Sequence, residues 1–306
     1  MTLRRRFVLV HILPIVLIGL VLFAPKARPG LRPCGALLAA AGVIELLFLA
    51  ALARRRRAGE PATAPCDIVT LVWALLTGWE LATSVLHFAH PVLVPAPEAV
   101  FDTFREQPLV LLRGVASSLE LLAAGFSIGL ALAVLLGLFA GWIDRLRAFA
   151  YPIANVMAPI PAVVLSPYLV SLMPSFRSAS ALVIVLGVFW PTFLGTINRV
   201  TSIEPQILDS ARMLQPDNRT MIFSILLPYV LPGVISGLKV SMTTSLLMLN
   251  FAELMGATSG MGYYVQNSIT YANYAHAVAG IIVIGVVVTI LNALITKFQK
   301  FAIRWH

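Results

Sequence analysis

Residues 209–228, DSARMLQPDNRTMIFSILLP, form a polar and charged segment in a chain that is otherwise mostly apolar. The runs on either side, 179–197 and 230–251, are each apolar and long enough to cross a bilayer. The connection between them is about thirty residues, too long for a simple turn. Its apolar residues recur at helical spacing, as Ile207, Ala211, Leu214, Met221 and Ile225 show. The pattern predicts a short helix held at the membrane surface, where a soluble partner can dock.

The composition of the chain is that of a membrane protein. Hydrophobic residues make up 59% and charged residues 11% of the 306 residues, whereas soluble domains carry about 25% charged residues. The mean hydropathy is +0.91. Eight apolar runs are long enough to span, near 7–24, 35–53, 67–88, 115–140, 149–172, 178–198, 230–252 and 277–296. The sequence therefore predicts an all-α fold, a polytopic bundle of about eight transmembrane helices.

Lys and Arg are distributed unevenly between the two sides of this topology. With the N-terminus in the cytoplasm, 15 of the 22 cationic residues fall on cytoplasmic segments, six fall on the other side, and Lys239 lies inside a span. This bias satisfies the positive-inside rule and places both termini and the 199–229 segment in the cytoplasm. The net charge of +9 does not indicate nucleic-acid binding, because the cations lie at span ends, where the anionic membrane surface attracts them.

The first apolar run could also be the hydrophobic part of a cleavable signal peptide, since Arg4–Arg6 precede it. Its core is long and Ala24-Pro25-Lys26 is a poor cleavage site, so we expect an uncleaved span. In this topology Cys34 and Cys66 lie on opposite sides of the membrane and would not form a disulfide. No spacing typical of a metal site is evident.

The 209–228 segment resembles the signature of ABC importer permeases. In that signature a Glu-Ala-Ala triplet is followed by Gly at the sixth position after the Glu, and by Ile-x-Leu-Pro at the sixteenth to nineteenth positions after it. Here these places hold Asp209-Ser210-Ala211, Gln215 and Ile225-Leu226-Leu227-Pro228. Asp keeps the charge and Ser keeps the small size, whereas Gln215 replaces a glycine that would let the chain turn between two short helices. Pro216 and Asp217 follow at once, and proline fixes a turn by another route.

From residue 67 onward the chain also resembles the permeases of nitrate, sulfonate, taurine and bicarbonate importers. The matching stretches are Val94-Pro95-Ala96-Pro97, Ser117-Ser118-Leu119, Gly125-Phe126 with Gly129, Pro159-Ile160-Pro161-Ala162, Ala252-Glu253-Leu254 and Ser259-Gly260-Met261-Gly262-Tyr263. They predict a six-span permease core over 67–300 and an extra N-terminal unit of two spans over 1–60. The family pattern assigns no role to the extra unit.

The resemblance implies a transport subunit with no catalytic residue, no metal site and no cofactor of its own. A separate cytoplasmic ATPase dimer would bind ATP and Mg²⁺ and grip the helix around 204–220. Asp209 would offer charge to this partner, while Ala211 and Leu214 would enter a groove in it. The full set of coupling residues is Asp209, Ser210, Ala211, Leu214, Gln215 and Pro228.

The same resemblance implies further partners and a location. A second copy of the chain would complete the pathway, and an extracytoplasmic solute-binding protein would deliver the solute. The assembly would lie in the lipid bilayer of a bacterial inner membrane. We expect a small anion such as a sulfonate, taurine, nitrate or bicarbonate, but similar permeases also carry small heterocyclic precursors, and no residue of this chain selects among these solutes.

Four residues are candidates for the pathway or its gate. Pro159, Pro161 and Pro167 fall inside one predicted span, where each removes a backbone donor and clashes with the preceding turn. The span is predicted to be broken or kinked, either beside a solvated pathway or as an ordinary proline kink packed by its neighbours. Glu253 lies near the outer end of the seventh span, where it would shape a gate or pair with a neighbour.

Glycines in two places have simpler interpretations. Gly125, Gly129, Gly137 and Gly141 recur along the fourth span and predict close helix packing. The glycine-rich stretch 256–262 lacks the Lys-Ser/Thr of a phosphate-binding loop and is expected to form a tight loop between the last two spans.

Two other functions remain open from the sequence. A membrane scaffold without transport fits the composition but does not explain the docking segment. An intramembrane hydrolase needs paired catalytic groups at one depth; His87 and His90 are three residues apart, but Pro91 ends that helix and no third group is evident. Among acidic residues in or near the spans, Glu120 is expected to be solvated, and the sequence offers no explanation for Glu45.

Overall fold

The computed structural model describes residues 3–23, 35–57, 59, 63–86, 90 and 92–302, and their side chains from residue 10 onward. Within these residues all regular secondary structure is helical, which confirms the predicted all-α fold. The chain forms two compact units. One comprises Met1–Leu111 with Val265–Ile282, and the other comprises Leu112–Tyr264 with Val283–His306.

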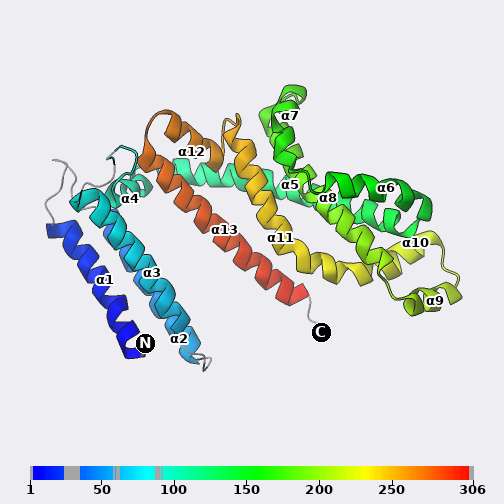
Figure 1. Ribbon diagram of the computed structural model, residues 1–306, viewed down its shortest axis with the longest axis horizontal. Helices are drawn as coiled ribbons and strands as arrows, with labels where there is room; N and C mark the ends of the chain where they lie inside the picture. Colours follow the sequence, from blue (N-terminus) through cyan, green and yellow to red (C-terminus); the bar gives the residue numbers. More distant parts are fainter. Residues whose placement is uncertain are drawn as a thin grey trace. The chain divides into compact units, whose positions relative to one another are not determined.

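The first unit is a bundle of three long helices and one short amphipathic helix (Figure 1). The elements are α1 (Leu3–Phe23), α2 (Gly35–Arg57), α3 (Thr63–Glu80), the π-helical turn η1 (Leu81–Val85) and α4 (Pro97–Glu106). α3 packs against α1 and α2, and α2 packs against α4. Leu17, Leu37 and Trp73, one from each long helix, are buried together in its core.

A polar pair lies between two of these helices. Nδ1 of His11 on α1 and Oε1 of Glu45 on α2 are 3.2 Å apart. Glu45 therefore has a partner that its sequence context does not reveal, and pairing of this kind is how membrane helices tolerate ionisable side chains. The predicted boundary between an extra unit, 1–60, and a permease core, 67–300, was drawn from the resemblance to the family. The two compact units do not test that boundary, so it stays a prediction.

The remaining helices lie wholly or partly in the second unit, because residues 108–111 and 265–282 belong to the first. They are α5 (Pro108–Trp142), α6 (Asp144–Met157), the 3₁₀ turn η2 (Ala162–Leu165), α7 (Ser166–Leu172), α8 (Phe176–Thr201), α9 (Pro205–Met213), α10 (Asn218–Thr220), the π turn η3 (Met221–Leu226), α11 (Leu227–Leu254), α12 (Met261–Thr270) and α13 (Tyr274–Ala302). α11 packs along α8, and α8 also contacts α6 and α7. A buried cluster that includes Phe126, Ile184 and Leu246 joins α5, α8 and α11.

Glycines set the distance between α5 and α8. A Cβ atom placed on Gly129 would lie 2.9 Å from the carbonyl oxygen of Val185, and one on Gly141 would lie 2.6 Å from Cβ of Val200. Gly125 and Gly137 meet α8 in the same way. The predicted close packing through small residues is confirmed.

Six described helices are long and apolar enough to cross a membrane. They are Gly35–Arg57, Thr63–Val85, Pro108–Trp142, Phe176–Thr201, Asn218–Leu254 and Tyr274–Ala302. The predicted span 149–172 is a pair of helices, Asp144–Met157 and Ala162–Leu172, bent by 85°. The predicted first span lies in α1, in which the residues with described side chains form a shorter apolar helix, Val10–Phe23. Among the residues whose side chains are described, length and composition support six spans, or seven if the bent pair counts as one. This count does not test the predicted first span, because it does not cover the start of α1.

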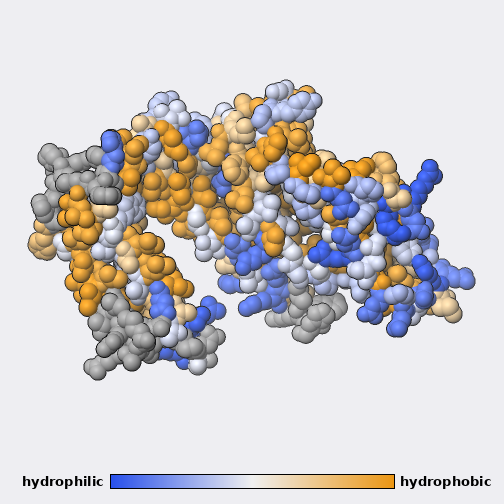
Figure 2. Space-filling view, viewed as in Figure 1, coloured by the Kyte–Doolittle hydropathy of each residue, from blue (hydrophilic) through white to orange (hydrophobic). Residues whose placement is uncertain are grey.

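The surfaces agree with a chain in a bilayer. In Figure 2, hydrophobic residues cover much of the visible surface of α1 to α3. Within the second unit, hydrophilic residues gather over α9 and α10. Glu120 pairs with Arg177 while its side chain stays 72% exposed, and the expectation that water solvates it stays a prediction.

Some residues selected from the sequence lie outside the described ranges, namely His87, Pro91 and Cys34. His90 is exposed, and its Nδ1 accepts a hydrogen bond from the N–H of Val92 at 3.3 Å. Cys66 is buried.

Candidate functional site

The predicted docking helix is present as α9, a helix of nine residues between α8 and α10 (Figure 1). Pro205 opens it, where the missing N–H would have had no helical partner. It ends at Met213, so the helix expected over 204–220 is wrong in its extent. The cause is Gln215, whose φ of +50° lies in the left-handed region, followed by Pro216, which cannot continue the helix.

Gln215 therefore adopts the backbone conformation for which glycine is usually selected. Its N–H donates to the carbonyl of Arg212 at 2.9 Å, which closes the last turn of α9. The next helix starts at once, because the side chain of Asp217 accepts a hydrogen bond from the N–H of Thr220 at 3.3 Å. Hydrogen bonds from the side chain and the backbone of Thr220 hold the pKa of Asp217 below its usual value. The bend implied by the family signature is thus formed without its glycine.

Ala211 anchors α9 to its own chain. It is buried in a cluster with Ile203, Met221, Ile222 and Leu226. Its side chain packs against the start of the α10–α11 helix, while the expectation that it also enters a groove of the ATPase stays a prediction. A helical stripe shows which residues share a face, but it does not show whether that face turns inward or outward.

A cation–aromatic contact also holds α9 in place. The guanidinium carbon of Arg212 lies 5.7 Å from the ring centroid of Trp142, the last residue of α5. Nε1 of Trp142 donates to Oδ1 of Asn218 at 3.0 Å. One tryptophan therefore links the end of α5 to α9 and to the start of α10.

The outer face of α9 carries the remaining coupling candidates. Met213 is 84% and Leu214 is 81% exposed, at the end of the helix. Asp209 is exposed and lies 3.4 Å from Nη1 of Arg212, whereas the hydroxyl of Ser210 donates to the carbonyl of Gln206 at 2.7 Å. Two adjacent apolar side chains beside an acidic one form a surface that a soluble protein can bind. Met213 lies off the helical stripe formed by Ile207, Ala211 and Leu214, so the periodicity of the sequence does not select it.

Pro228 lies inside a continuous helix that runs from Asn218 to Leu254. Just before it, the N–H of Leu227 bonds to the carbonyl of Ile222, five residues back, in a π-helical turn. The wider turn comes directly before Pro228, which has no backbone N–H to donate. Pro228 is exposed, and the described chain gives it no side-chain role beyond helix geometry.

The broken span has a specific cause. The helix α6 ends at Met157, and the backbone leaves helical geometry around Pro159 and Pro161 before η2 begins. The predicted break is confirmed at these two prolines. Pro167 does not kink a helix, because it lies in the first turn of α7, where proline is well tolerated. All three prolines are exposed, and their place beside a pathway stays a prediction.

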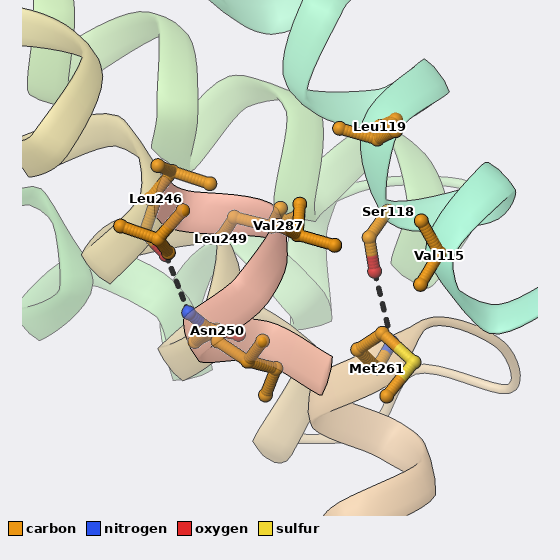
Figure 3. Close-up of a pocket in the computed structure, with 10 residues that line it drawn as sticks. Val115, Ser118, Leu119, Leu246, Leu249, Asn250, Met261 and Val287 are labelled. Atoms are coloured by element: carbon orange, nitrogen blue, oxygen red, sulfur yellow. Dashed lines mark hydrogen bonds between the residues drawn. The ribbon is translucent and has the colours of Figure 1, made fainter. Parts of the chain in front are cut away.

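Glu253 is the centre of a buried polar network (Figure 3 shows its Ser118–Met261 part). Its carboxylate accepts a hydrogen bond from Oγ of Ser118 on α5 at 2.7 Å, through Oε1, and one from the N–H of Gly262 at 2.7 Å, through Oε2. Oγ of Ser118 in turn accepts from the N–H of Met261 at 2.9 Å. The carboxylate therefore caps the first turn of α12, where the helix dipole favours a negative charge.

The loop before α12 is shaped around this carboxylate. Gly260 has a φ of +113°, and a Cβ atom there would lie 2.2 Å from Oε1 of Glu253. A Cβ atom on Gly262 would lie 2.8 Å from Cβ of Glu253. The glycine-rich stretch 256–262 is thus a tight loop closed over Glu253, which agrees with the prediction of a loop. Of the two roles considered for Glu253, pairing with neighbours is the one observed, while a gating role is not tested.

Comparison with known proteins adds an identity to this geometry. Residues 133–304 match the family described as "Binding-protein-dependent transport system inner membrane component". The taurine transport system permease protein TauC of Escherichia coli is 24% identical over 247 residues, which cover 78% of this chain and 89% of TauC. The nitrate import permease protein NrtB of Leptolyngbya laminosa is 25% identical over 181 residues, or 59% of this chain and 65% of NrtB.

A solved structure has the same fold. The MetNI methionine ABC transporter, in its inward-facing conformations, contains a chain that superimposes with a TM-score of 0.53 at 18% identity. The match covers 65% of this chain and 97% of the other.

Proposed function

The chain belongs to the family of inner membrane components of binding-protein-dependent transport systems, and from this premise we propose that it is the permease subunit of an ATP-driven importer for a small anion. The solute class is supported by relatives named for taurine and nitrate, both of which carry an anionic group. In this proposal the chain has no ATPase site, and a separate cytoplasmic subunit binds ATP and Mg²⁺.

The observation that carries the proposal is the surface of α9. Ala211 fixes the helix to the start of the helix that continues into α11, and Arg212 fixes it to the end of α5, yet Met213 and Leu214 stay exposed. A helix seated this firmly transmits a push to the bundle, whereas a flexible loop would absorb it. Exposed apolar side chains on a seated helix are what a partner needs to grip.

The proposed assembly follows from the family and from the charge distribution. Two copies of the chain enclose the pathway, since a closed dimer is the simplest way to complete it. The ATPase dimer binds α9 of each copy on the cytoplasmic side, where both termini also lie. A solute-binding protein delivers the anion from the opposite side, and ATP-driven closure of the ATPase switches the pathway between its two orientations.

Replacement of Leu214 by Glu tests the coupling role. Leu214 is 81% exposed, so the substitution leaves the bundle folded. Loss of one buried leucine contact at the interface, about 1.5 to 3 kcal/mol, lowers affinity for the ATPase at least about tenfold. The matched control is Met255→Glu, because Met255 is also apolar and exposed but follows the other end of α11.

The measurement is titration of the ATPase subunit that co-purifies with the chain, using chain purified in mild detergent. We expect Leu214→Glu to lose binding while Met255→Glu keeps it and both variants elute as folded particles. Equal binding by the two variants would remove α9 as the coupling site. Purification without any ATPase, even after cross-linking, would instead favour a scaffold.

A further inference from the structure

The middle of α11 carries a row of exposed side chains. Pro232, Ser236, Lys239, Thr243 and Leu247 are all exposed and follow each other at intervals of three or four residues. This spacing places them on one face of the helix. The face is polar in its centre, with an ammonium group between two hydroxyl groups.

Parts of the other faces of α11 pack against helices of the second unit. Toward α8, Arg199 donates from Nη2 to the carbonyl of Gly233 at 3.1 Å, and Met248 meets Gly187. On another side, Leu246 and Leu249 are buried against α5. The row therefore lies on a part of α11 that the helices of this unit leave uncovered, together with the exposed apolar side chain of Val240.

Lys239 lies deep within a membrane-crossing helix. It follows Leu227 by twelve residues and precedes Leu254 by fifteen, which is roughly 18 Å and 22 Å along the axis. It also lies six residues, about 9 Å, beyond the level at which Arg199 contacts Gly233. A lysine at this depth is costly in lipid, and such residues face a protein interior or a water-filled cavity.

Within the part of the chain that the structure describes, the ammonium group of Lys239 has no carboxylate within ion-pair distance. The neighbouring hydroxyl groups do not replace one. Oγ of Ser236 donates to the carbonyl of Pro232 at 2.9 Å, and Oγ1 of Thr243 donates to the carbonyl of Lys239 at 2.9 Å. Because both hydroxyl protons are donated to backbone carbonyl groups, the ammonium charge of Lys239 is the dominant polar feature of the face.

We propose that this face of α11 lines the translocation pathway and that Lys239 forms a binding site for a small oxyanion. The inference rests on the proposed function and deepens it, since it assigns the solute class to a residue. A single ammonium group provides charge-assisted hydrogen bonds to one carboxylate, sulfonate or nitrate group. One such contact is weak enough for release, as passage through a pathway requires. The face becomes apolar again at Leu247 and Phe251, which confines the site to the middle of the helix.

Cysteine accessibility tests the inference without knowledge of the solute. Cys34 and Cys66 are first replaced by serine and alanine, and a reporter is introduced as Thr243→Cys, one turn from Lys239. The complex of this chain with its ATPase is treated with two methanethiosulfonate reagents, one bearing a sulfonate and the other a quaternary ammonium group. The control reporter is Leu231→Cys, which is exposed on a different face of α11.

We expect the reporter at 243 to react and the reporter at 231 to stay unreactive in lipid, because these reagents need an ionised thiol in water. The sulfonate reagent should be favoured by Lys239. The substitution Lys239→Gln should lower the ratio of sulfonate to ammonium labelling rates about tenfold, while Lys239→Arg preserves the ratio.

Each outcome decides the inference. An unreactive Thr243→Cys in a complex that still holds its ATPase shows that the face meets lipid or protein, with Lys239 reaching a lipid phosphate, and overturns the pathway. If Thr243→Cys reacts but Lys239→Gln leaves the ratio of sulfonate to ammonium labelling rates unchanged, the anion site is overturned while the pathway stands. Failure of the chain to associate with an ATPase at all refutes the proposed function instead, so the two failures are distinct.

Discussion

The contact between α5 and α8 makes a quantitative prediction at Gly129. In Gly129→Ala the new methyl group would lie 2.9 Å from the carbonyl oxygen and 3.1 Å from Cα of Val185. Both atoms belong to the backbone, so no rotamer change relieves the overlap. Ordinary carbon contacts lie at about 3.5 to 4.0 Å, and α5 must therefore retreat by roughly 0.5 to 1 Å, which weakens dispersion along the interface. Overpacking of this kind destabilises by about 1 to 3 kcal/mol.

Alanine also favours helix more than glycine does, by about 1 kcal/mol, and this gain would mask part of the loss. The control Gly285→Ala on α13 has the same gain in helix propensity without the overlap, because a Cβ atom there would meet nothing within 4 Å. Comparison of the two variants therefore removes the propensity gain from the result. Thermal unfolding in detergent, followed by tryptophan fluorescence, should place the apparent Tm of Gly129→Ala below that of Gly285→Ala by about 2 to 8 °C. Equal apparent Tm values would refute the reasoning, since they would show that α5 and α8 are not held at the observed distance.

Two further substitutions probe the turn after α9 and the network around Glu253. Gln215 has a side chain in the left-handed backbone region, with a φ of +50°, so Gln215→Gly should stabilise the turn by about 1 kcal/mol. Proteolysis between α9 and α10 should become slower. Faster cleavage would contradict the left-handed conformation. Glu253→Gln keeps the shape but places an amide NH₂ against the hydroxyl of Ser118 or the N–H of Gly262. Loss of one charge-assisted bond, about 1.5 to 3 kcal/mol, should speed hydrogen exchange at Met261 and Gly262, and unchanged exchange would mean that other contacts hold the loop.

Features that depend on local sequence were predictable. The prolines predicted the break near Pro159 and Pro161, and the glycine periodicity predicted that α5 packs closely on a neighbouring helix. The sequence did not show that this neighbour is α8. The turn after α9 was also foreseeable, because Pro216 ends a helix whatever precedes it. Pro167 shows the limit of this reasoning, since a proline one residue inside a new helix has the opposite effect from one in the middle.

Features that depend on tertiary contacts were not predictable. Ser118 and Glu253 are 135 residues apart, and no local signal pairs them. The inward direction of Ala211 depends on where the cluster of Met221 and Ile222 lies. The partner of Glu45 is His11 on a separate helix. In each case the sequence marks an unusual residue, but only the packing shows what that residue contacts.

The second unit gives a physical route from the docking surface to the buried carboxylate. α9 packs through Ala211 on Met221 and Ile222, which begin the helix that continues to Leu254. Because packed side chains transmit displacement with little compression, a pull on α9 moves the start of this helix. Near Pro228 and Pro232 the ladder of backbone bonds is interrupted, so bending is easiest there, below Lys239. The segment that swings then carries Lys239 in its middle and Glu253 at its far end. A change at the docking surface would therefore reorient the anion site and strain the loop over Glu253 in a single motion.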